Sequence, residues 1–131
     1  MGKPVARMND PVTGTDIHIV LVPSVTGTVP TPLPHPYAGR IVGGCVTSVL
    51  VNGQPVAVDG STSQLNSPHI PQGGSFSRPP TGTGRVVAGP CRVLAGGQRL
   101  ACLGDQVITC NDPVDAPTST ITVASTNVVA G

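Results

Sequence analysis

The chain has 131 residues, a formal net charge of +1, 17 Gly, 15 Pro and no Trp. This length predicts a single domain over residues 1–131. The few, scattered basic residues give no electrostatic footprint for nucleic acid, and no apolar run approaches the length of a membrane span. The segment Met1–Asp10 lacks the apolar core of a secretory signal, so we expect synthesis in the cytoplasm without a signal peptide.

The composition also predicts the fold class. Glu is absent and Lys3 is the single lysine, whereas Val, Thr and Ile are plentiful, which favours strands. Pro and Gly interrupt the chain too often for a long helix. We therefore expect an all-β fold. Tyr37 and Phe76 are the only aromatic residues, so the core is weak and a bound metal or a partner should add stability.

Three stretches are degenerate copies of one repeated unit, aligned on a shared alanine: Gly2–Arg7, Gly53–Val58 and Gly97–Cys102. Repeats of this kind stack or wrap around an axis. The pairs Asn52-Gly53 and Gly96-Gly97 lie between short apolar runs and predict two β-hairpins. The first copy begins at its turn, so we expect the tail Ile121–Val129 to supply the missing strand and close a ring without open edges.

A long loop is expected after each copy, because Pro, Gly, Ser and Thr are concentrated there; the three loops are Thr13–Pro36, Ser61–Pro80 and Thr109–Pro117. All three histidines lie in the first two loops, and Cys110 opens the third. His18 and His69 follow the shared alanine of their copies by the same twelve residues (18 − 6 and 69 − 57), and Cys110 follows its alanine by nine (110 − 101). This phasing indicates one site shared by the copies.

His18, His35, His69 and Cys110 form a candidate ligand set for one tetrahedral Zn²⁺. The alternative is that the histidines are unrelated surface residues. We expect the zinc to be structural, because four protein ligands fill a tetrahedron and no Glu is present as a general base. Asp16, two residues before His18, is interpreted as a hydrogen-bond partner of a histidine, with a general base as the alternative. The other cysteines, Cys45, Cys91 and Cys102, are interpreted as small buried hydrophobic residues.

The stretch Lys3-Pro4-Val5-Ala6-Arg7 resembles the Pro-Ala-Ala-Arg signature of the PAAR-repeat family, and Asn52–Ala57 with Gly60 looks like the repeated unit of that family. The resemblance implies a small, cone-shaped β fold with pseudo-threefold symmetry. It also implies an apex fixed by zinc on three histidines and one cysteine, matching His18, His35, His69 and Cys110. Two departures are the third copy, which reads Gln98-Arg99-Leu100-Ala101-Cys102, and the pair Asn111-Asp112 after Cys110, where the family often has His.

The resemblance further implies a structural protein without enzymatic activity. One chain would cap the trimeric β-helical spike of a contractile injection system, either type VI secretion or an extracellular phage-tail-like particle. It would help to pierce the target membrane and be delivered outside or into the target cell. We expect the spike contact at the apolar, Gly-rich turns Gly43-Gly44 and Ala88-Gly89, with internal turns as the alternative reading of these two pairs. Only 21 residues (131 − 110) follow Cys110, too few for a toxin domain. The alternatives are an adaptor that loads effectors or cargo through Gln72–Ser77, and a small zinc hydrolase.

Overall fold

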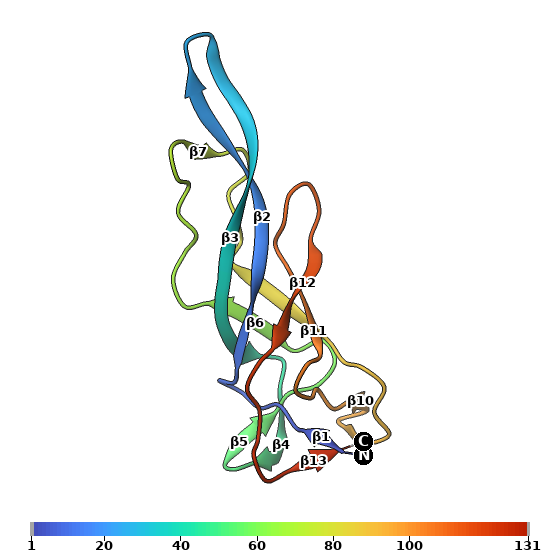
Figure 1. Ribbon diagram of the computed structural model, residues 1–131. Helices are drawn as coiled ribbons and strands as arrows, with labels where there is room; N and C mark the ends of the chain where they lie inside the picture. The colour runs from blue at the N-terminus through green and yellow to red at the C-terminus, as the bar shows by residue number, and fades with distance from the viewer. Residues whose placement is uncertain (1, 131) are drawn as a thin grey trace.

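The computed structural model describes residues 2–130, and within this range the protein is all-β, as predicted. The strands are β1 (Lys3–Pro4), β2 (Pro11–Ser24), β3 (Gly27–Gly43), β4 (Val46–Val51), β5 (Gln54–Val56), β6 (Thr62–Leu65), β7 (Ser75–Phe76), β8 (Thr83–Val87), β9 (Leu94–Ala95), β10 (Gln98–Arg99), β11 (Gln106–Thr109), β12 (Ala116–Ile121) and β13 (Val129–Ala130). No helix in the described range is long and apolar enough to cross a membrane. Figure 1 shows the long β2–β3 hairpin extending away from the end that carries β1, β13, β4 and β5.

The three sequence copies meet in a closed ring of backbone hydrogen bonds. The N–H of Ala6 donates to the carbonyl of Ala101 at 2.9 Å, that of Ala101 donates to Ala57 at 2.9 Å, and that of Ala57 donates to Ala6 at 3.0 Å. All three alanines are completely buried. Because each copy donates to one neighbour and accepts from the other, the three copies occupy equivalent positions in a cyclic pattern of backbone hydrogen bonds.

The same bonding pattern repeats outward from this ring. Two residues after each alanine, an N–H donates to the next copy: Met8 to Pro55, Asp59 to Arg99 and Leu103 to Pro4. The residue that follows has a positive φ in every copy: Asn9 at 74°, Gly60 at 88° and Gly104 at 86°. Glycine enters this left-handed region without cost and asparagine does so more readily than other residues, so the copies tolerate this exchange.

Six strands close around the axis beyond the alanine ring. Each copy is followed by one pair of strands: β2 and β3, β6 and β8, and β11 and β12. Successive pairs are joined by antiparallel ladders, and the pairing of β12 with β2 completes the cycle. The buried side chains inside this cycle pack with the ring alanines: Val12, Tyr37, Ile41, Val86, Val107 and Ile121. Closure leaves these six strands with paired edges along most of the cycle.

The predicted hairpins are confirmed. The β4–β5 turn contains Asn52 and Gly53 with φ of 53° and 80°, and the β9–β10 turn contains Gly96 and Gly97 with φ of 57° and 81°. Two positive φ values are what a tight type I′ turn requires. The two ends of the chain also pair as expected, because β1 and β13 form an antiparallel ladder. Only the last part of the expected tail strand takes part, with Pro4 opposite Val129.

The prediction of a first long loop was wrong. Most of Thr13–Pro36 belongs to the β2–β3 hairpin, which pairs continuously from Pro11 opposite Arg40 to Ser24 opposite Gly27. The four prolines of β3, which suggested a loop, are spaced two residues apart: Pro30, Pro32, Pro34 and Pro36. Their missing N–H groups therefore all fall on one edge of the strand, and the ladder to β2 uses the other edge. The outer edge of β3 pairs with β6 only from Gly39 onward, so these prolines interrupt no ladder.

The other two predicted loops are partly regular. Ser61–Pro80 contains β6 and β7, with an irregular segment between them, and β7 pairs with β2 at Val20 and Leu21. The third loop, Thr109–Pro117, overlaps the end of β11 and the start of β12. These connections and the outer part of the β2–β3 hairpin extend away from the end of the molecule that carries β1 and β13 (Figure 1).

Candidate metal centre

Three histidines from distant parts of the chain lie together. His18 is on β2, His35 is on β3, and His69 lies in the irregular segment between β6 and β7. The ring centroids are 5.0 Å apart for His18 and His69, 5.3 Å for His18 and His35, and 5.4 Å for His35 and His69. The rings are inclined to one another by 54° to 62°, so they are not stacked.

This nearly equilateral arrangement fits ligands of one ion. With metal–nitrogen bonds of about 2.0–2.1 Å and tetrahedral angles, the ring centroids of three imidazoles should be separated by roughly 5 Å. The ring of Phe76 lies at similar distances, 5.7 Å from His18 and 5.4 Å from His35, so the separations permit a shared ion without requiring one. The geometry of the rings therefore fits a single metal ion between them.

His18 gives a second and independent indication. Its side chain is completely buried, and neither Nδ1 nor Nε2 has a hydrogen-bond partner. The nearest carboxylate oxygens are Asp112 Oδ2 at 3.7 Å from Nδ1 and Asp16 Oδ2 at 3.9 Å from Nε2, both beyond hydrogen-bond range. A buried polar group without a partner is costly. The cost is offset if one nitrogen binds a metal.

The electrostatics of His18 agree with a ligand role. Burial lowers the pKa of His18, and the neighbouring His69 lowers it further, whereas the carboxylates of Asp112 and Asp16 oppose the change. A lowered pKa keeps the imidazole neutral, which is the form that coordinates a metal.

Asp16 joins this cluster. Its carboxylate, His18 and His69 form a group whose possible ligand atoms all lie within 4.8 Å of one another, so this group could hold a metal ion. Asp16 Oδ2 lies 3.0 Å from His69 Nε2, and Oδ1 accepts hydrogen bonds from the hydroxyls of Thr109 and Thr118. The sequence singled out Asp16 only as a partner of histidine. Its position two residues before His18 places both side chains on one face of β2.

The other two predicted ligands, His35 and Cys110, are buried, but neither is a member of the group formed by Asp16, His18 and His69. The two residues that follow Cys110 in the chain, Asn111 and Asp112, bond to β2. Asn111 Oδ1 accepts a hydrogen bond from the N–H of Ile17 at 2.6 Å, and the N–H of Asp112 donates to the carbonyl of Ile17 at 2.8 Å. The structure thus brings the rings of the three predicted histidines together, and the ligand roles of His35 and Cys110 stay predictions.

Asp112 and Arg78 hold this part of the chain against β2. Asp112 Oδ2 accepts from the N–H of Ile19 at 2.8 Å, and Asp112 Oδ1 accepts from Arg78 Nε at 3.0 Å. The side chains of residues 111 and 112 therefore bond to the edge of β2 at Ile17 and Ile19, where no regular strand covers it.

All four cysteines are free thiols. Of the three that were predicted to be buried, Cys102 is buried, whereas Cys45 and Cys91 are only half-buried.

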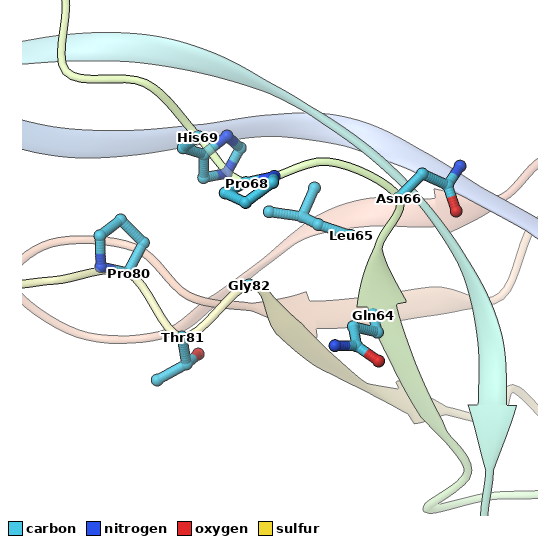
Figure 2. A pocket seen from close by; sticks show the side chains of 8 residues that line it. All are labelled: Gln64, Leu65, Asn66, Pro68, His69, Pro80, Thr81 and Gly82. Atoms are coloured by element: carbon cyan, nitrogen blue, oxygen red, sulfur yellow. The ribbon is translucent and has the colours of Figure 1, made fainter.

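A pocket of about 420 Å³ lies on one side of His69, between β6 and Pro80–Gly82. Figure 2 shows His69 at its edge, beside Pro68. His69 is the only titratable side chain among the eight residues that line this pocket. The lining of this pocket brings no carboxylate, and the buried carboxylate of Asp16 lies beside His69 outside the pocket.

Comparisons of this chain with protein-family models, with curated proteins and with solved structures gave no match.

Proposed function

We propose that this protein is the structural, metal-stabilised tip of a contractile injection system, of the type VI or extracellular phage-tail-like kind. One copy caps a trimeric β-helical spike and helps it to pierce the target membrane. The class comes from the resemblance to PAAR-repeat proteins. The observation that carries the proposal is a set of exposed apolar side chains that repeats with the threefold pattern of the alanine ring.

These side chains lie on the three short hairpins. Leu50 is opposite Pro55, Leu94 is opposite Arg99, and Val129 is opposite Pro4. Each of these partners lies two residues before a ring alanine, so the three apolar residues occupy equivalent positions. Their exposed fractions are nearly equal, at 59 % for Leu50, 59 % for Leu94 and 63 % for Val129. Exposed apolar residues at three equivalent positions of one end of the molecule are candidates for an interaction surface.

The symmetry of this set indicates the kind of partner. A single chain cannot form three equal contacts unless its own surface repeats three times, and a threefold trimer presents three equal subunits at its end. The strands β1, β13, β4 and β5 lie at the end of the molecule opposite the tip of the β2–β3 hairpin (Figure 1). In the proposed assembly the hairpin end is the leading apex of a cone and the apolar set faces the spike. The turns Gly43-Gly44 and Ala88-Gly89 remain a prediction for additional contacts.

The metal in this proposal is one structural Zn²⁺, bound by His18, His35, His69 and Cys110. Neutral imidazoles and a thiolate suit zinc. When bound, the ion supplies a cross-link between the β2–β3 hairpin and the irregular segment that carries His69. The complete burial of His18 supports a structural role, because a catalytic zinc needs a position open to substrate.

Mixing the zinc-loaded protein with the trimeric spike of the same genome tests the proposal. Native mass spectrometry should detect one tip per three spike chains. Replacing Leu50, Leu94 and Val129 by Asp, singly and together, should weaken binding in steps while the zinc content stays at one per chain. Ile70→Asp is the matched control, since Ile70 is 72 % exposed but lies outside the threefold set. Equal loss of binding in the control, or none in the triple variant, would contradict the proposed surface.

A further inference from the structure

We propose that Asp16 is a positioning residue for the metal and not one of its ligands. Its carboxylate holds Nε2 of His69, so that Nδ1 of His69 is the coordinating atom. The carbonyl of Leu33 acts in the same way on Nδ1 of His35 and leaves Nε2 as the coordinating atom. The ion thus receives a mixed set of imidazole nitrogens. This inference rests on the metal centre of the proposed function and specifies how the chain presents its ligands.

The carboxylate of Asp16 is already occupied by donors. Oδ1 accepts from two hydroxyls, those of Thr109 and Thr118, and Oδ2 lies 3.0 Å from Nε2 of His69. Asp16 is completely buried, so no water competes for these oxygens from bulk solvent. Hydroxyl donors on one oxygen and an imidazole on the other are the surroundings of a carboxylate that orients a metal-binding histidine.

The two hydrogen bonds determine which nitrogen is available on each ring. A neutral imidazole has one N–H donor and one acceptor nitrogen. A carboxylate accepts only, so His69 must carry its proton on Nε2 and keep the lone pair of Nδ1 free. A backbone carbonyl also accepts only, and His35 Nδ1 lies 2.9 Å from the carbonyl of Leu33. His35 therefore keeps the lone pair of Nε2 free.

The register of the β2–β3 hairpin places ligands and orienting groups side by side. Asp16 is opposite His35, and His18 is opposite Leu33. Each of these two cross-strand pairs therefore joins one ligand to one orienting group, and the pairs are separated by a single pair, Ile17 and Pro34. Residues two apart on a strand share a face, so one face of the hairpin carries both ligands. A shift of one residue in this register would turn them to the opposite face.

Nitrogen NMR of the zinc-loaded protein, with ¹⁵N-labelled histidine and two-bond ¹H–¹⁵N correlations, tests the inference directly. The expected result is coordination through Nδ1 of His69 and Nε2 of His35, with a proton on Nε2 of His69. Coordination through Nε2 of His69 would overturn the role of Asp16 and leave the proposed tip intact. A protein that binds no zinc would overturn the proposed metal centre and this inference with it.

Variants of Asp16 supply a second readout. Asp16→Ala should lower zinc affinity about 10- to 100-fold, the usual loss when an orienting partner is removed. Asp16→Asn should lose less, because its amide oxygen still accepts from His69. The stoichiometry should stay at one ion per chain, and the Co²⁺ absorption of both variants should keep the band pattern of the wild type. A changed Co²⁺ band pattern in Asp16→Ala, as expected for a lost ligand, refutes the inference. Asp115→Asn, an exposed carboxylate, is the matched control.

Discussion

Replacing His18 by leucine should stabilise the protein when metal is removed and destabilise it when zinc is present. Both ring nitrogens of His18 are buried without partners. Each buried polar group left in that condition costs about 1–3 kcal/mol, so the metal-free protein carries a penalty of that order at this residue. Leucine is of similar size and has no polar atom, and the neighbouring ring of Phe76 offers it an apolar contact.

We therefore expect His18→Leu to gain about 1–3 kcal/mol over the wild type in chelator. Zinc reverses this order. A ligand present at 1,000 times its dissociation constant stabilises the folded state by about 4 kcal/mol, and the variant loses most of this gain because it lacks one ligand. Thermal unfolding followed by circular dichroism, with chelator and with excess zinc, measures both differences.

His69→Leu is the informative control, because its side chain has a partner. Removing it leaves the buried carboxylate of Asp16 without the donor at 3.0 Å, so this variant should be less stable than the wild type even in chelator. Opposite signs for the two variants without metal are the expected outcome. If His18→Leu were less stable than the wild type in chelator, the unpaired imidazole would not destabilise the metal-free protein. The argument for a metal ligand at His18 would then fail.

Three further predictions concern other parts of the molecule. A Cβ on Gly14 would lie 2.3 Å from the carbonyl oxygen of Thr118, so Gly14→Ala should separate β2 from β12 and cost about 1–3 kcal/mol in denaturant unfolding, with weaker zinc binding. Burial, and after it the charge of Asp105, raises the pKa of Cys102 from 9.0 to about 11. The thiol is therefore held neutral in the folded state, so stability present below pH 9 should fall by on the order of 2 kcal/mol as the pH rises toward 11, and Cys102→Ala should flatten this decline. Chelation should speed proteolysis within residues 66–74, which carry His69 between β6 and β7, while cleavage elsewhere changes little.

The parts of the fold that depend on local patterns were predictable from the sequence. The shared alanines define the threefold ring, and Asn52-Gly53 and Gly96-Gly97 define two hairpins, because a left-handed turn leaves a recognisable residue signature. The β2–β3 hairpin was missed for a physical reason. Proline density was read as a loop signal, whereas the two-residue spacing from Pro30 to Pro36 keeps the ladder to β2 complete.

The candidate site was predictable to a similar extent. The equal spacing of His18 and His69 from their alanines indicated that they converge, and they do. The place of Asp16 in the cluster depends on Thr109 and Thr118, which reach it from strands about a hundred residues away along the chain. No sequence spacing specifies such a contact, because it arises only when β12 closes the cycle against β2.

The alanine ring repeats in all three copies, whereas the histidine cluster does not. The ring depends on backbone groups and the cluster on particular side chains. The ring needs a small residue on the axis and backbone N–H and carbonyl groups, which nearly any sequence retains, so three worn copies still close it. The centre needs particular side chains. The first copy is followed by His18 and His35 and the second by His69, while the third is followed by Thr109, which bonds to Asp16, and Asn111, which bonds to β2. The third copy therefore holds in place what the other two present, and in the proposed centre it also adds Cys110. In the proposed tip, the base keeps a threefold pattern for a trimer while the apex is free to diverge, since substitutions in the histidine cluster leave the backbone hydrogen bonds of the alanine ring unchanged.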